Sequence, residues 1–218
     1  GKLIPFSGTF YDHCAKTYVH AINKVSLHYA DKKTNYPIGF RIYEKEKDVA
    51  DEEAFKTKIE LALALITEAV KMHKMPSKTF VFDSWYMSKD MCDGIENLGR
   101  DWIGACKSSL LVTYKGEFMS LEDFAKQAPE KMFMDTQIEG SKYRVFTKKL
   151  FMKSLDRRVR IIISRDEKNR TIFLATNRKD FVVKIVVAYM LRWKIEQFYK
   201  DAKEHLGLED CQIRDPGG

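Results

Sequence analysis

The chain has 218 residues, of which 44% are hydrophobic, and a formal net charge of +7. This composition supports a folded core and favours a polyanionic partner, although the basic residues are scattered among 31 acids and form no polybasic tail. No apolar run reaches the roughly 18 residues of a membrane span and no signal peptide is recognisable, so we expect a cytoplasmic protein without membrane association. The four cysteines show no CxxC spacing, which favours free thiols over disulfides or a zinc site.

The first 43 residues predict β structure. β-branched and aromatic side chains alternate loosely over residues 8–13 and 17–29, which is typical of an antiparallel strand pair. A polar turn at 31–35 separates them from a further strand at 36–43, which has Pro37 near its start. Three strands are therefore expected before the first helix.

The pattern then changes to alternating helices and strands. Asp51 can cap a helix that runs to about His73. The side chains expected to face the core from this helix are Phe55, Ile59, Leu63, Ile66 and Val70. Residues 78–82 and 102–106 are short apolar runs of strand type, and 87–98 between them predicts a helix closed by a glycine. The strand–helix–strand order predicts a parallel β-α-β unit and an α/β core.

Residues 108–176 have a different texture, because short strand-like runs alternate with polar turns. These runs are 110–114, 143–147, 158–164 and 171–175. We expect them to form a β-rich insertion outside the core sheet, followed by one last helix from about 181 to 206. The expected division is therefore a first core part at 1–107, the insertion at 108–176, and a final core helix within 177–218.

Four side chains on this last helix are expected to share one face. They are Tyr189, Arg192, Glu196 and Lys203. Their spacings of 3, 4 and 7 positions place them within an arc of roughly 60°. A separate apolar stripe is formed by Leu191, Ile195, Phe198 and Ala202. A carboxylate can hold a divalent metal and Arg or Lys can hold phosphate, so the face suits phosphodiester chemistry. The alternative is a solvated helix face with ordinary ion pairs four residues apart.

The spacing Tyr-(2)-Arg-(3)-Glu-(6)-Lys resembles the signature of bacterial insertion-sequence DDE transposases, as does the Arg-Trp-x-Ile-Glu-x-Phe string that begins at Arg192. The resemblance extends to the Asp-Ser-Trp-Tyr string from Asp83, the Ile-Gly-x-x-Lys string ending at Lys107 and the Leu-Ala-Thr-Asn string ending at Asn177. It therefore covers most of the chain. It implies a ribonuclease-H-like α/β core with a β-rich insertion before the last helix.

The resemblance also implies which carboxylates are catalytic. Asp83 follows an apolar strand, where sites form in a parallel sheet, although a turn or helix-cap role is an open alternative. In the family, Asp83 and Glu196 would hold Mg²⁺, with Mn²⁺ as a substitute, and would have to lie close together. Such metal ions catalyse phosphoryl transfer in pairs about 4 Å apart. The implied activity is cleavage of DNA at element ends and joining of those ends to a target.

Further residues are implied to contact DNA. They are Tyr189, Arg192, Lys203, Trp193 and Lys107. The first three would hold phosphates beside the cleaved bond, and Lys107 would contact the DNA backbone. Trp193 could stack on a base, although a place in the core is equally open. The implied partners are the double-stranded DNA of the element ends and target, and a second copy of the chain in a homodimeric DNA complex.

One departure from the family pattern concerns the first catalytic Asp. In the family it lies in an Asp-Asp-Thr motif on the first core strand, and no such motif occurs here. Gly1-Lys2 resembles the link just after that motif, so we expect a fragment that lacks the first core strand and does not cleave DNA by itself. Asp12 is the nearest substitute but follows a different strand. The alternatives are a non-catalytic DNA-binding remnant and a ribonuclease-H-like nuclease.

Overall fold

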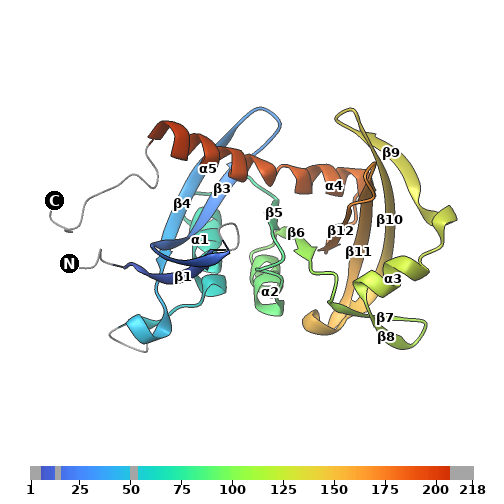
Figure 1. The fold of residues 1–218 in the computed structure, drawn as a ribbon, viewed down its shortest axis with the longest axis horizontal. Coiled ribbons are helices and arrows are strands. Elements are labelled where there is room, and N and C mark those ends of the chain that lie inside the picture. The colour runs from blue at the N-terminus through green and yellow to red at the C-terminus, as the bar shows by residue number, and fades with distance from the viewer. Residues whose placement is uncertain (1–5, 13–15, 50–53, 207–218) are drawn as a thin grey trace. The chain divides into compact units, whose positions relative to one another are not determined.

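The computed structural model describes residues 6–12, 16–49 and 54–206. The chain divides into two units, whose elements Figure 1 shows. The terminal unit consists of Gly1–Met75 with Trp193–Gly218, and the central unit is Pro76–Arg192. The predicted β-α-β unit therefore belongs with the β-rich span rather than with the first strands. Among the described residues, none of the helices combines the length and the apolar character that crossing a membrane requires.

In its described residues, the terminal unit is built from two antiparallel hairpins and two α-helices. The strands are β1 (Gly8–Asp12) with β2 (Thr17–Ala21), and β3 (Asn23–Ala30) with β4 (Asn35–Tyr43). The helices are α1 (Lys58–Lys71) and α5 (Trp193–Leu206), and a short 3-10 helix spans Glu46–Asp48. The predicted turn between β3 and β4 is confirmed. The carboxylate of Asp31 accepts hydrogen bonds there from the backbone N–H groups of Lys33 and Thr34, at 2.7 and 2.8 Å.

Helix α1 begins later than predicted. Thr57 and Glu60 form a capping box, in which Glu60 N donates to Thr57 Oγ1 at 3.2 Å and Thr57 N donates to Glu60 Oε2 at 2.7 Å. The expected cap, Asp51, lies outside the described residues. The buried side chains are Leu61, Ala62, Leu65, Ile66 and Ala69, so only Ile66 of the predicted stripe is fully buried. Apolar residues occur nearly all round this helix, and periodicity alone could not select the stripe that packs.

The central unit is organised around one eight-stranded sheet in the order β5-β6-β12-β11-β10-β7-β8, with β9 paired to β10. The strands are β5 (Thr79–Phe82), β6 (Asp101–Cys106), β7 (Leu111–Tyr114), β8 (Glu117–Ser120), β9 (Met134–Ile138), β10 (Ser141–Met152), β11 (Arg157–Asp166) and β12 (Thr171–Thr176). Only β5 and β6 are parallel, and α2 (Lys89–Asn97) connects them, which confirms the predicted β-α-β unit. The result is a mixed α/β fold that is compatible with a ribonuclease-H-like core.

The expectation that the β-rich span lies outside the core sheet is wrong. It is mainly β structure, as predicted, but β12 pairs antiparallel with β6, from Phe173 opposite Cys106 to Thr176 opposite Ile103. The remaining strands continue the same sheet from β12 outwards. The physical reason is the apolar character of β12, whose last four residues are all buried. A strand buried on both faces is stable only with neighbours on both edges and cover on both sides.

Helices cover both faces of this sheet. On one face, α4 (Val182–Met190) packs on a fully buried cluster that includes Ile103, Ile162 and Leu174. On the other face, α2 buries Cys92, and its Glu96 accepts a hydrogen bond at 2.6 Å from the indole of Trp102. That indole is stacked on Phe82 with ring centroids 6.1 Å apart. Further along, α3 (Leu121–Gln127) contributes Phe124 to an aromatic group on the sheet. Short 3-10 helices span Glu130–Met132 and Lys153–Leu155.

Two cysteines of the central unit are free thiols, as expected for a protein without disulfides at these positions. Cys92 is 0% exposed and Cys106 is 8% exposed. Burial raises the pKa of Cys92 to about 12 and raises that of Cys106 as well. The other two cysteines, Cys14 and Cys211, lie outside the described residues.

Candidate functional site

Asp83 directly follows β5, at the carboxyl end of the parallel pair β5–β6. Its side chain is exposed, and its Oδ1 accepts a hydrogen bond from the backbone N–H of Trp85 at 2.8 Å. Its Oδ2 makes no hydrogen bond with any other described residue. The turn alternative and the metal-ligand hypothesis are therefore compatible, because the turn uses one oxygen and leaves the other accessible.

The predicted last helix is in fact two helices. Helix α4 ends at Met190 and α5 begins at Trp193, with a turn at Leu191 and Arg192. Arg192 N donates to Tyr189 O at 3.0 Å, so a tighter bond between residues three apart replaces the regular helical pattern. Within α5, Glu196 and Lys203 are seven positions apart and share one helix face. Tyr189 and Arg192 belong to the central unit, so the common face predicted for all four residues stays a prediction.

Helix α5 presents Glu196 and Lys203 as exposed side chains because other residues attach it to the β3–β4 hairpin. Ala202 is buried, and Phe198 meets His28 edge-on with ring centroids 4.8 Å apart. The Tyr199 hydroxyl lies 2.5 Å from Ser26 Oγ. The residues predicted for the apolar stripe thus provide part of the packing, with Tyr199 in addition.

The remaining predicted DNA contacts lie in different surroundings. Tyr189 is a residue of α4 and belongs to the buried cluster between that helix and the sheet. The guanidinium of Arg192 lies 5.7 Å from the Tyr189 ring centroid. Trp193 is 62% exposed, so it is not a core aromatic. Lys107 is exposed just after the end of β6. Tyr189, Arg192 and Lys107 belong to the central unit, and Trp193 belongs to the terminal unit.

Asp83 belongs to the central unit and Glu196 to the terminal unit, so their close approach stays a prediction. Asp12 is the last residue of β1, where it pairs with Thr17. Over residues 6–12, 16–49 and 54–206, no group of three or more His, Cys, Asp or Glu side chains is placed to hold a metal ion. A two-carboxylate set supplies oxygen ligands of the type Mg²⁺ prefers, but fewer than paired ions require.

The sequence analysis missed a group of cations that lines a cavity in the central unit. A cavity of about 510 Å³ is lined by Glu96, Thr147, Lys148, Lys149, Arg157, Arg158, Val159, Arg160, Thr176, Asn177, Arg178 and Lys179. The sequence signal was the Arg-Arg-x-Arg string at the start of β11, together with the pairs Lys148-Lys149 and Arg178-Lys179. No local pattern shows that these three segments meet, because strand register brings them together.

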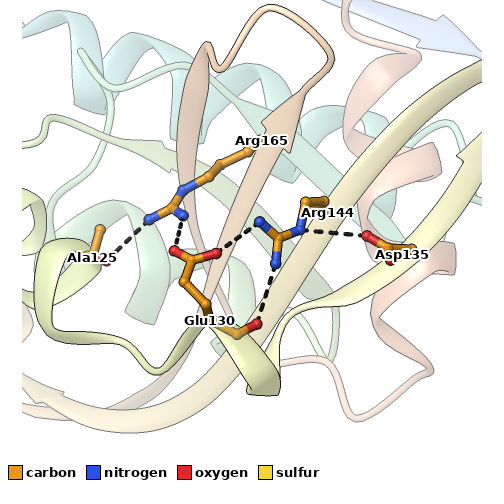
Figure 2. A network of polar contacts seen from close by, with 5 residues as sticks. All are labelled: Ala125, Glu130, Asp135, Arg144 and Arg165. Atoms are coloured by element: carbon orange, nitrogen blue, oxygen red, sulfur yellow. Dashed lines mark hydrogen bonds and ion pairs between the residues drawn. The ribbon is translucent and has the colours of Figure 1, made fainter.

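A second group of arginines has a structural role. Figure 2 shows Arg144 and Arg165 on either side of Glu130, whose carboxylate oxygens each accept one guanidinium N–H at 2.7 Å. Arg144 also pairs with Asp135 at 3.4 Å, and Arg165 donates to the Ala125 carbonyl at 3.0 Å. The Arg165 and Arg144 hydrogen bonds lower the pKa of Glu130 below its ordinary value of 4.5. These cations are neutralised within the protein.

We expect Glu130→Gln to weaken the dependence of stability on acidic pH. A carboxyl whose pKa is lowered by folding stabilises the native state above its unfolded pKa, and this stabilisation is lost as the pH falls through the folded pKa. The wild-type chain should therefore lose stability more steeply than the variant as the pH falls below about 4.5. Urea denaturation between pH 3 and pH 7 measures the difference. Glu117→Gln, which removes an exposed carboxylate from β8, should leave the wild-type profile unchanged, and identical profiles for all three proteins would contradict the expectation.

Comparison with known protein families identifies the class. A family model described as "Archaeal putative transposase ISC1217", of the DDE transposase class, matches residues 29–214. That match covers most of the chain and includes both Asp83 and Glu196. The chain belongs to this transposase family. No curated protein sequence matches the chain. The family is archaeal, and the bacterial origin suggested by the signature stays a prediction.

Proposed function

We propose that the chain is part of the catalytic domain of a DDE transposase that cuts DNA at element ends and joins them to a target. The observation that carries this proposal is the family match over residues 29–214. The ribonuclease-H-like interpretation is consistent with it, because β5 and β6 are parallel and an acid follows β5. The substrate is double-stranded DNA, and the complex on DNA contains two copies of the chain.

In this proposal Asp83 and Glu196 hold Mg²⁺, which supplies charge stabilisation and an activated oxygen nucleophile when bound. The turn bond from Trp85 fixes Asp83 through Oδ1, so Oδ2 is the oxygen offered to the ion. Glu196 lies in the first turn of α5, with Lys203 on the same face. Lys203 would hold a phosphate beside Glu196, as a point charge that attracts the DNA backbone without reading its sequence.

The second candidate is DNA binding without cleavage. It is favoured by the excess of basic over acidic residues, with 38 Lys and Arg against 31 Asp and Glu. Paired Mg²⁺ ions need several carboxylate oxygens to offset their mutual repulsion. DNA affinity depends mainly on Lys and Arg and does not need such a group.

Nicking of a supercoiled plasmid in Mg²⁺ or Mn²⁺ separates the two candidates. We expect no nicking by this chain alone, and nicking by a version that carries an Asp-Asp-Thr strand ahead of it. In that version Asp83→Asn and Glu196→Gln should each reduce the rate by at least about 100-fold, since each removes a metal ligand. Full activity in both variants would overturn the catalytic proposal. Nicking by the short chain that Asp12→Ala abolishes would identify Asp12 as the first acid.

A further inference from the structure

The cavity of about 510 Å³ in the central unit lies where the sheet continues beyond α4. Lys149 of β10 is opposite Arg160 of β11, and Arg160 is opposite Thr176 of β12, so these three residues form a row across one face. Two positions along, Ile162 and Leu174 belong to the buried cluster that α4 covers. The same sheet face is therefore apolar beneath the helix and cationic beyond it.

The charge of the lining residues is strongly unbalanced. Seven of the twelve are Lys or Arg, and Glu96 is the single carboxylate among them. Glu96 is already bound to Arg157, through two hydrogen bonds of 2.9 and 3.1 Å. Arg178 is paired with Asp180 at 2.7 Å. These two arginines are thus neutralised, and the remaining cations carry the excess charge.

Of the five remaining cations, Lys148 has its ammonium 4.7 Å from the ring centroid of Tyr114. The other four form what we call the basic groove: Lys149, Arg158, Arg160 and Lys179. None of them is paired with a carboxylate of any residue that the structure describes. Arg160 donates to Thr147 Oγ1 at 2.9 Å and to the Asp180 carbonyl, so neutral groups hold its guanidinium in place. Its charge is oriented but not neutralised, which is the state suited to binding an anion.

A second cavity in the same unit provides a comparison. It has a volume of about 600 Å³ and is lined by three cations, Lys142, Arg144 and Arg165, and three acids, Asp135, Asp166 and Glu167. The arginines there are bound by Glu130 and Asp135. The excess charge of the basic groove is therefore a local property and not simply the chain's net charge of +7.

The basic groove is separate from Asp83. Arg178, which lines the same cavity, donates to Thr79 Oγ1 on the first residue of β5 at 2.9 Å, whereas Asp83 follows the last residue of that strand. A strand of four residues spans roughly 13 Å. The groove and the candidate catalytic acid thus lie toward opposite ends of β5.

We propose that the basic groove binds the phosphate backbone of double-stranded DNA and positions the duplex on the central unit. The choice of DNA rests on the proposed function, and the choice of backbone rests on the lining. None of the twelve lining residues is aromatic, so the cavity has no surface on which unpaired bases could stack. Lys and Arg instead neutralise phosphates and release counterions, which gives affinity without sequence preference.

The test compares two triple variants that remove the same charge from the same unit. The groove variant is Lys149→Gln, Arg158→Gln and Lys179→Gln, and the control is Lys131→Gln, Lys142→Gln and Lys168→Gln. All six side chains are exposed, so both variants should fold. Arg160 is retained because it also has structural contacts. Fluorescence anisotropy with a labelled duplex of about 30 base pairs, between roughly 50 and 200 mM salt, gives the affinity and its salt dependence.

We expect the groove variant to bind the duplex about 100-fold more weakly. The negative slope of log K against log[salt] should become shallower by about 0.9 for each phosphate that the protein no longer neutralises. The control should bind nearly as the wild-type chain does. Equal losses in both variants would show diffuse attraction and overturn the proposal, as would a groove variant that binds the duplex as tightly as the wild-type chain. Plasmid nicking is a separate readout. If the chain nicks DNA but the groove variant binds the duplex as the wild-type chain does, the groove proposal alone is refuted. If duplex binding depends on the groove but no version nicks DNA, only the catalytic proposal is refuted.

Discussion

Leu174→Ala is expected to lower the free energy of unfolding of the central unit by about 2–5 kcal/mol, because it leaves a cavity in a packed core. Leu174 is 0% exposed in β12, where it lies opposite Ala105 of β6 and Ile162 of β11. It belongs to the buried cluster beneath α4. Its removal therefore affects the strand that joins the β-rich span to β5 and β6.

Urea denaturation, with hydrogen exchange to separate the two units, measures this effect. Ile172→Ala is the matched control, because Ile172 lies on the same strand but is 37% exposed. Its loss should cost less than about 1 kcal/mol, since little apolar surface is removed from a buried position. Equal costs for the two variants would show that β12 is not the packed centre of this unit.

Gly104→Ala is expected to destabilise the central unit by about 1–3 kcal/mol through overpacking. A Cβ at Gly104 would lie 2.3 Å from Met87 Cε and 2.3 Å from Phe82 Cε2. The Met87 side chain can move, but Phe82 is stacked on Trp102 and cannot easily do so. Because Asp83 follows Phe82 directly, a displaced ring would also disturb the backbone that carries the candidate catalytic acid.

A double-mutant cycle with Met87→Ala tests this reasoning. Removing the Met87 side chain should restore part of the stability that Gly104→Ala removes, because one of the two close approaches disappears. Gly39→Ala provides a milder comparison, since its Cβ would meet only Leu65 Cδ2, at 3.3 Å. A Gly104→Ala variant as stable as the wild-type chain would contradict the close packing of Phe82 against Gly104 of β6.

Local signals predicted the β5-α2-β6 unit well. The apolar run at 78–82, just before Asp83, predicted β5, and Gly99, which has φ +66°, closes the helix region as predicted. Gly104 belongs to the Ile-Gly-x-x-Lys string that supported the family resemblance. Its structural reason is the close approach of Phe82 and Met87, which the sequence could not show.

Pairing between distant segments was the main information that the sequence lacked. The apolar run of β12 predicted a strand but not its partner, and the partner, β6, decided that the β-rich span extends the core sheet. The same limitation applies to the basic groove, since only the register places Lys149 opposite Arg160. The turn at Leu191 also had no signal, because the segment contains neither Gly nor Pro.

The two buried thiols give the central unit an internal reporter of its own opening. Cys92 lies on α2 and Cys106 at the end of β6, and burial keeps both thiols protonated near neutral pH. Since the thiolate is the reactive form, an alkylating reagent can modify them only in molecules whose core has transiently opened. The rate of labelling then counts those openings, and the same chain bound to a DNA duplex can be compared with the free chain without introducing any probe.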